Sequence, residues 1–379
     1  MTLAAYDGTN APTLKLQFYK SNAWTTVSSS DVREIFLTRG KFRADQDITP
    51  GQMIVTLDNF SGDYDPDNTS GTWVVSSKSI IKDGLPVQLI FTWSAVDYTL
   101  FAGFMETVEM DYGFDPTATF TVVDALAIVA RVEMPALNDY YHQGETTSTR
   151  VSRILGNVSL SPFTHWQSGS VAMIETTEGK NALQLIRECV DAQAGQFYAR
   201  KDGSLTLLDL NDKFTRPTQL TFNDDRTYSN AVEYDVIKTT PGTLQVVNKA
   251  IITRGKYSQK VATNDASITS WGIRALTKEC LVQSDAVGHK LAIYYAKKDS
   301  DPTTTVAQVQ FEAIALGALF PDFLTLELQD MVRVIRTTPG ANVTRTMNCV
   351  VEGLDYHITP DSWRATYYCS PMNSYKVVL

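Results

Sequence analysis

Histidine, paired cysteine and long apolar runs are all scarce in this chain of 379 residues. Its four cysteines (Cys189, Cys280, Cys349 and Cys369) lie far apart, without the C-x-x-C spacing of a metal knuckle. We therefore expect free, mostly buried thiols and no cofactor. An iron–sulfur cluster would have to gather ligands from four distant positions, an alternative that spacing alone leaves open.

Catalytic motifs are missing as well. The four histidines form no H-E-x-x-H pair, and His142 lies in "DYYHQGE", which is more typical of a contact loop than of an acid/base site. "EGKNAL" lacks the upstream glycine of a phosphate-binding loop and has Asn181 in place of Ser or Thr. No G-x-S-x-G is present. We predict no catalytic, cofactor-binding or metal-binding residue and no enzyme activity.

The bulk numbers describe an acidic globular protein. Apolar residues make up 43%, the net charge is -9, and the length favours two to four domains. The acidic balance argues against a nucleic-acid-binding surface over the whole protein. It is compatible with a protein that DNA passes without adhering, because negative charge repels phosphate. The stretch 118–137 is interrupted by Asp124, Arg131 and Glu133, and the N-terminus lacks a secretory pattern. We expect a soluble protein without membrane insertion, made in a cytoplasm.

Alternating apolar and polar residues predict strands in 1–125 and again in 229–379, separated by an α+β segment at 126–228. In that segment, apolar residues at helical spacing predict a helix over 182–190, capped by Thr176 or Thr177 and ended by Gly195. Asp202–Gly203 then predicts a hairpin turn, and Ser284 the start of one long helix in the last region. The fold class is mainly β with an α+β insert.

The two β regions resemble each other weakly. "DGLPVQLIF" followed by "LFAGFMETVEMDYGFDPTATFTVVD" resembles "QDMVRVIRTTPG" followed by "CVVEGLDYHITPDSWRATYYCSP", with Gly103 and Gly353 as matching glycines. Duplication and chance similarity between hairpins explain the pattern equally well.

The stretch 39–68, "RGKFRADQDITPGQMIVTLDNFSGDYDPDN", has a distinctive composition but contains no His, no Cys and no catalytic motif. Its Asp-rich end lacks the frame of a calcium-binding loop and predicts Asx turns instead. It resembles the N-terminal signature of minor tail proteins from long-tailed bacteriophages, in which an Arg–Gly–basic triplet precedes a Pro–Gly turn, a strand and a Pro–Asp–Asn loop. "LFAGFMETVE", "GKNALQLIRECVDAQAGQFYARKDGSLTLLD" and "VEGLDYHITPDSWRATYYCSP" extend the resemblance over most of the chain.

The resemblance implies a tail-tip or baseplate hub of two tail-tube-like β-barrels (1–125 and 229–379) flanking the α+β module (126–228). It implies a homotrimer with pseudo-sixfold symmetry in the virion, assembled in the bacterial host cytoplasm. The implied partners are the distal tail protein ring, the tape measure protein and tail spike or fibre proteins, with DNA only as passing cargo. Because the chain stops at Leu379, we expect wall digestion and receptor binding to belong to partners. The residues that carry the structural motif are Arg39, Gly40, Pro50, Gly51, Leu57, Asn59, Pro66, Asn68, Gly103, Gly353 and Trp363.

Two alternatives remain. One is the hexameric distal tail protein, which has one tube-like domain. The other is a carbohydrate-binding or carbohydrate-cleaving β-protein, in which Trp73, Tyr140, Tyr141 and Trp166 stack on sugars. For the hub, Arg39 and Lys41 are expected to face a neighbouring subunit.

Overall fold

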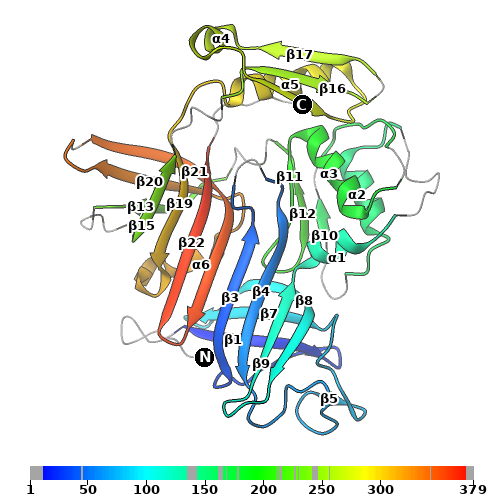
Figure 1. Cartoon of the computed structure of the whole chain (residues 1–379), viewed down its shortest axis with the longest axis vertical. Helices are drawn as coiled ribbons and strands as arrows, with labels where there is room; N and C mark the ends of the chain where they lie inside the picture. The colour runs from blue at the N-terminus through cyan, green and yellow to red at the C-terminus, as the bar shows by residue number, and fades with distance from the viewer. Residues whose placement is uncertain are drawn as a thin grey trace.

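The computed structural model is shown in Figure 1. It describes residues 12–43, 46–134, 143–160, 165–167, 169–176, 179–210, 212, 216–225, 228, 230–240, 246–255, 257–341 and 343–372. A 14-stranded sheet runs through the molecule, and smaller α+β parts lie beside it and at the top of the view. The chain is therefore mainly β with an α+β segment between its two β regions, as the sequence predicts.

The first β region forms seven consecutive antiparallel strands of this sheet, which we call the first β unit. Their order in space is β3-β4-β9-β8-β7-β1-β2. Alternating apolar residues bury one face of each strand, as in Leu14, Leu16 and Phe18 of β1. A short hairpin of β5 (Val74–Val75) and β6 (Lys78–Ser79) lies in the connection from β4 to β7. The bounds are β1 (Thr13–Lys20), β2 (Ala23–Thr26), β3 (Val32–Gly40), β4 (Thr49–Asp58), β7 (Pro86–Trp93), β8 (Val96–Asp111) and β9 (Thr117–Val123).

The α+β module follows. Helices α1 (Ala125–Arg131), α2 (Thr147–Leu155) and α3 (Ala182–Gln193) lie beside a three-stranded sheet of β10 (His165–Gln167), β11 (Gln196–Ala199) and β12 (Leu205–Leu208). The predicted α3 helix and the hairpin turn at Asp202–Gly203 are confirmed. The predicted caps of α3 are wrong.

The correct caps of α3 have clear local reasons. Asn181 accepts from the backbone N–H of Gln184, whose side chain accepts in return from the Asn181 N–H, so a capping box begins the helix at 182. At the other end Ala194, not Gly195, takes the left-handed conformation with φ 49°. Gly195 is required for another reason: a Cβ there would lie 2.2 Å from the carbonyl oxygen of Leu208.

The last β region forms the second β unit, whose seven strands are ordered β15-β19-β22-β21-β20-β13-β14. Strand pairing begins this unit at Thr218, ahead of the expected boundary at 229. The predicted strands of this region are confirmed. The bounds are β13 (Thr218–Asn223), β14 (Val232–Glu233), β15 (Val236–Thr240), β19 (Thr305–Glu312), β20 (Met331–Thr338), β21 (Val343–Thr359) and β22 (Ser362–Pro371).

The long helix predicted after Ser284 is confirmed, but it does not pack on this unit. Helix α5 (Asp285–Lys298) covers a separate three-stranded sheet of β16 (Lys249–Thr253), β17 (Gln259–Thr263) and β18 (Ala275–Glu279), accompanied by α4 (Asp265–Trp271). This α+β part is inserted between β15 and β19. A 3-10 helix, η4 (Ala313–Leu319), and α6 (Phe320–Thr325) connect β19 to β20.

The two β units have the same strand order both along the chain and across the sheet. β1, β2, β3, β4, β7, β8 and β9 correspond in turn to β13, β14, β15, β19, β20, β21 and β22. One difference is that β13 pairs in parallel with β20 and β14, whereas β1 pairs antiparallel with β7 and β2.

The residue register of the repeat comes from two matching β-bulges. Glu106 is the extra residue of β8 against β9, and Glu352 is the extra residue of β21 against β22. With these bulges superposed, Gly353 corresponds to Thr107 rather than to Gly103. The sequence comparison therefore found the right strands but paired the wrong glycines, because close backbone contacts need glycine at a different place in each unit.

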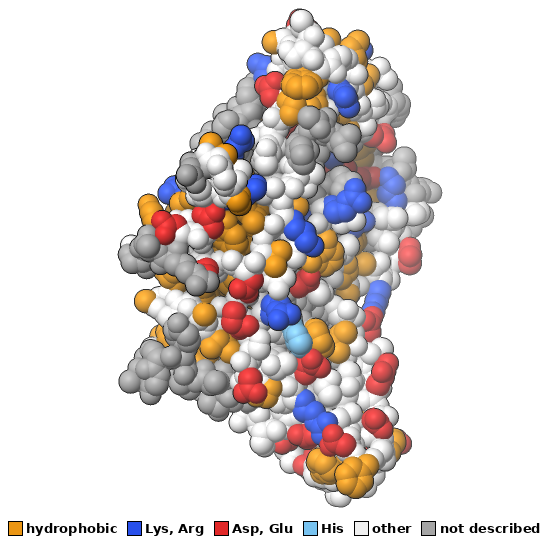
Figure 2. All heavy atoms as spheres, turned by 60° about the vertical axis from the view of Figure 1, so that its left-hand side comes forward, with side chains coloured by type: hydrophobic (Ala, Val, Ile, Leu, Met, Phe, Trp, Pro, Cys, Tyr) orange, Lys and Arg blue, Asp and Glu red, His pale blue; other side chains and the backbone are white. Residues whose placement is uncertain are grey.

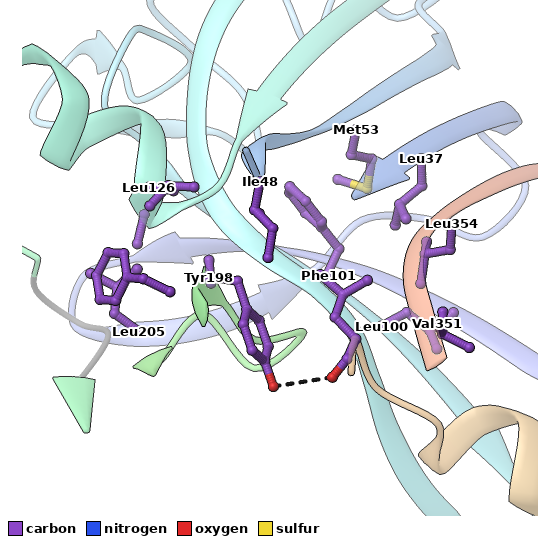
Figure 3. Packing of buried hydrophobic residues seen from close by; sticks show 14 of the residues in the cluster. Leu37, Ile48, Met53, Leu100, Phe101, Leu126, Tyr198, Leu205, Val351 and Leu354 are labelled. Atoms are coloured by element: carbon purple, nitrogen blue, oxygen red, sulfur yellow. Dashed lines mark hydrogen bonds between the residues drawn. The ribbon is translucent and has the colours of Figure 1, made fainter. Parts of the chain in front are cut away.

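Buried apolar side chains form one continuous core across both units and the module. Trp363 of β22 is fully buried, and its ring centroid lies 4.3 Å from that of Phe91 in β7. Figure 3 shows Leu37 and Met53 of the first unit near Val351 and Leu354 of the second, with Tyr198 of the module on the other side. Across the described segments, no helix has the length and apolarity needed to cross a membrane.

Candidate interface at the junction of the two β units

The two β units are joined where β3 pairs antiparallel with the second half of β21. Gly40 lies opposite Gly353, Phe36 opposite His357 and Ile35 opposite Ile358. The backbones approach closely here: a Cβ on Gly40 would lie 2.2 Å from the carbonyl oxygen of Glu352, and Gly40 has a φ of 87°. Both constraints exclude other residues at Gly40.

A buried ionic cluster lies behind this junction. Arg39 Nη2 donates to Glu327 Oε1 and to the carbonyl oxygen of Ala199, each at 2.7 Å. Glu327 Oε2 accepts from the backbone N–H of Lys201 at 2.9 Å. Arg39, Ala199 and Glu327 belong to the first β unit, the module and the second β unit, respectively. One guanidinium therefore holds three parts of the chain together.

The electrostatics of this cluster favour the ionised carboxylate. Burial alone would raise the pKa of Glu327, but Arg39, Lys201 and two backbone N–H donors together lower it. Burial lowers the pKa of Lys201 to about 8, against the opposing attraction of Glu327. Tyr198 adds a neutral link by donating to the carbonyl oxygen of Leu328 at 3.1 Å, the bond dashed in Figure 3.

A second buried acid lies at the bulge. Glu352 Oε2 accepts from Gln329 Nε2 and Oε1 from Ser370 Oγ, both at 2.6 Å, and Lys41 Nζ lies 3.4 Å from Oε2. The expectation that Arg39 and Lys41 face a neighbouring subunit is therefore wrong. Both side chains are buried within the chain, because each compensates a carboxylate that the close packing of the two units removes from water.

The remaining residues of the 39–68 signature are structural in other ways. Pro50 and Gly51 lie inside β4 rather than in the predicted turn. The Gly51 N–H donates to Asp124 Oδ2 at 2.6 Å, and Asp124 also caps α1 through Leu126. Burial raises the pKa of Asp124 to about 7. Leu57 is fully buried on β4.

The predicted Asx loop is confirmed. Asn59 Oδ1 accepts from the Tyr64 N–H at 3.1 Å, and Asn68 bridges Gly62 and Ser70 at 2.9 Å each. Pro66 lies in this loop. Elsewhere, Gly103 is needed because a Cβ there would lie 2.2 Å from the carbonyl oxygen of Val123. Together with Trp363, these residues shape the β units, and the structure does not bring them into one site.

The outer face of the junction is partly exposed. The ring of Phe36 stacks on His357 with centroids 4.3 Å apart, and His357 Nε2 lies 2.6 Å from Glu34 Oε1. On the face in Figure 2, acidic and basic side chains are interspersed rather than gathered into one large patch. That distribution is unlike the continuous basic stripe of a nucleic-acid-binding surface.

The other candidate residues form no reaction site that the structure describes. The four cysteines are free and buried, as expected, and burial raises the pKa of the Cys189, Cys280 and Cys349 thiols to about 12. No cluster of three or more potential metal ligands occurs among the described residues. Trp73 is buried against Phe18, so it cannot stack on a sugar. His142, Tyr140, Tyr141 and the side chain of Trp166 lie outside the described residues.

Sequence reasoning missed the acids of the junction. Glu327 in "LTLELQD" and Glu352 in "VVEGL" are single acids among apolar residues. A single acid among residues whose pattern predicts burial indicates a carboxylate with a charged partner. The neighbouring sequence does not identify the partner of Glu327, which is Arg39, 288 positions away.

Solved structures of phage tail proteins resemble this fold over nearly its whole length. A tail protein from Neisseria meningitidis matches with a TM-score of 0.62 at 9% identity, over 95% of this chain and 96% of that one. The 43 kDa tail protein of prophage MuSo2 from Shewanella oneidensis matches at 0.58 and 11% identity, over 94% and 96%. Prophage tail protein gp18 from Listeria monocytogenes matches at 0.51 and 10% identity, over 96% and 95%. No family model and no curated protein sequence matches the chain.

The chain thus has the fold of phage tail proteins. The sequence resemblance to a phage tail-tip protein and the structural likeness agree.

Proposed function

We propose that this protein is a structural component of a phage tail, the hub at its tip. In this proposal three copies form a ring that joins the sixfold tail tube to a threefold spike or fibre assembly. Each β unit is a tail-tube-like barrel domain, with the module between them as the third domain. The role is architectural and not enzymatic.

The observation that carries this proposal is the repeat of one seven-strand unit within the chain. Two units with the same strand order lie side by side and are joined by β3–β21 pairing. Three such chains supply six similar units, so a threefold assembly can match a sixfold one. A protein with one unit per chain would need six copies to do the same, which favours the hub over the hexameric distal tail protein.

The proposed partners follow from that position. On one side the ring meets the distal tail protein ring and the tape measure protein, and on the other the spike or fibre proteins. DNA passes through the ring without being bound, a role that a net charge of -9 favours. The protein belongs to the virion after assembly in the host cytoplasm.

Counting copies tests the proposal. Native mass spectrometry of the purified protein, and of tail tips that contain it, is expected to show three copies per ring. Six copies would establish the distal tail protein instead. The carbohydrate alternative predicts release of reducing ends from host wall polysaccharide, and we expect none above the level of a heat-unfolded sample.

A further inference from the structure

Several strands have an edge without a neighbouring strand in the described part of the chain, among them β2 and β14 at the ends of the large sheet. Two further edges of this kind lie on β15 and on β8. Strand β15 pairs with β19 on one edge only. The second half of β8, from Thr107 to Asp111, pairs with β9 on one edge only, because β7 ends its pairing at Phe104. The two edges lie on different sides of the molecule (Figure 1). Natural proteins rarely leave such edges open, since unpaired N–H and C=O groups invite a further strand.

The internal junction shows what each edge pairs with. By the repeat, β15 corresponds to β3 and the second half of β8 corresponds to the second half of β21. Those two counterparts, β3 and β21, are the strands that pair at the junction. We propose that β15 of one copy adds antiparallel to the second half of β8 of another copy, in the register that β3 takes on β21. This inference rests on the proposed trimer and assigns its interface.

The register follows from the repeat. Counting from the two bulges, Tyr367 of β22 corresponds to Phe120 of β9. Val309 lies opposite Tyr367, and Val55 lies opposite Phe120, so these two residues correspond as well. Ile237 pairs with Val309 and Ile35 with Val55, and Ile237 therefore corresponds to Ile35. Asp111 takes the place of His357, counting five residues from each bulge.

The junction pairs Phe36 with His357. Since Lys238 and Phe36 are the next residues after Ile237 and Ile35, Lys238 of one copy lies opposite Asp111 of the next.

Charge on the two edges is complementary. The β8 edge has Glu106, Glu109 and Asp111 and no basic residue, whereas β15 has Lys238 and no acid. Lys238, Glu109 and Asp111 are all exposed and point away from the core face. Opposite charges directly across two strands stabilise their pairing.

Exposed apolar groups at the two edges support the same pairing. In the internal junction Ile35 and Ile358 are both fully buried. Their counterparts are Ile237 and Tyr112, and Tyr112 is 70% exposed in the isolated chain. Val236 beside Ile237 is 37% exposed. Strand addition would bury these side chains as the internal junction buries its own.

The arrangement is compatible with the proposed trimer. Each chain has one β15 edge and one β8 edge, so the contact is head-to-tail, which gives a ring where the rotation closes and an open filament where it does not. In a ring of three chains, six β units would alternate between internal junctions and junctions between chains.

Cysteine cross-linking in the full-length protein tests the register. Lys238→Cys with Asp111→Cys places two thiols opposite each other, where Cα atoms lie about 4.5–5.5 Å apart, within disulfide range. The matched control is Lys238→Cys with Thr107→Cys, on the same edge and face but four residues away, about 13 Å at 3.3 Å per residue. The parent protein controls for its four buried cysteines.

After copper-phenanthroline oxidation, we expect covalent trimers of the first pair on non-reducing gels, at least tenfold above the control pair and the parent. Equal cross-linking of the two pairs, or none for the first pair at any protein concentration, overturns the inference. Native mass of the unoxidised parent separates the two proposals: a trimer without the cross-link refutes only this interface, whereas a ring of six refutes the hub itself.

Charge reversal gives an independent readout. Lys238→Glu and Asp111→Lys are each expected to weaken the trimer at least tenfold in dissociation constant by analytical ultracentrifugation. The double reversal is expected to recover most of that loss. Additive weakening in the double variant would show that the two side chains do not meet.

Discussion

Replacing Arg39 by Met is expected to destabilise the protein strongly, because it leaves the Glu327 carboxylate buried without its main cation. Arg39 and Glu327 are 3% and 4% exposed, so water cannot replace the lost partner. Breaking a buried pair by removing one member costs about 3–5 kcal/mol. Met retains most of the apolar stem, so the loss reports on the charge and its hydrogen bonds rather than on a cavity.

Urea unfolding followed by tryptophan fluorescence measures this cost. The matched control is Lys15→Met, which removes the cation of the Lys15–Asp97 pair, whose side chains are 34% and 52% exposed. Exposed pairs contribute below about 1 kcal/mol. Adding Glu327→Gln to Arg39→Met is expected to restore part of the stability, because it removes the stranded charge. If Arg39→Met costs no more than Lys15→Met, the buried cluster does not hold the units together.

Three further outcomes are expected. Because the folded-state pKa of Asp124 is raised to about 7 from 3.8, the folded protein holds a proton that the unfolded chain releases between these values. This group's contribution to the free energy of unfolding therefore falls as pH rises from 4 to 7, by at most about 1.4 kcal/mol per pH unit. Asp124→Asn should flatten that slope in urea titrations at pH 5, 6 and 7. An unchanged slope would contradict the raised pKa of Asp124. Gly40→Ala is expected to cost more than about 3 kcal/mol in the same assay, since it combines a positive φ with a backbone clash, whereas Gly62→Ala, which has a φ of 69° and open space, should cost about 1 kcal/mol. Equal losses for the two glycine variants would show that the junction can open to admit a methyl group. Trp363→Ala is expected to cost about 3–5 kcal/mol by urea unfolding, because it empties a fully buried ring site between the units; a cost below about 1 kcal/mol would contradict its place in the shared core.

Local patterns predicted most elements well. Most strands of both β units, helix α3, the hairpin at Asp202–Gly203 and helix α5 follow from periodicity and turn chemistry that act within a few residues. Strand β13 is an exception, since it lies in the segment predicted as α+β. Local sequence does not determine the N-cap of α3, because several Thr and Asn residues could cap it and only the capping box with Gln184 selects Asn181. Pro50–Gly51 predicts a turn, but a proline and a glycine near the start of β4 are compatible with a strand.

The sequence by itself determined the alternation of β and α+β regions, the buried thiols and the Asx loop, because short-range patterns encode each of them. Only the tertiary structure decided the register of the repeat, the burial of Arg39 and Lys41, and which strand edges, β15 and β8 among them, have no partner in the described part of the chain. Strands pair although they lie hundreds of positions apart in the sequence, as at Gly40 and Gly353. A bulge at Glu106 or Glu352 shifts that choice by one residue, which reverses the faces that all later side chains occupy.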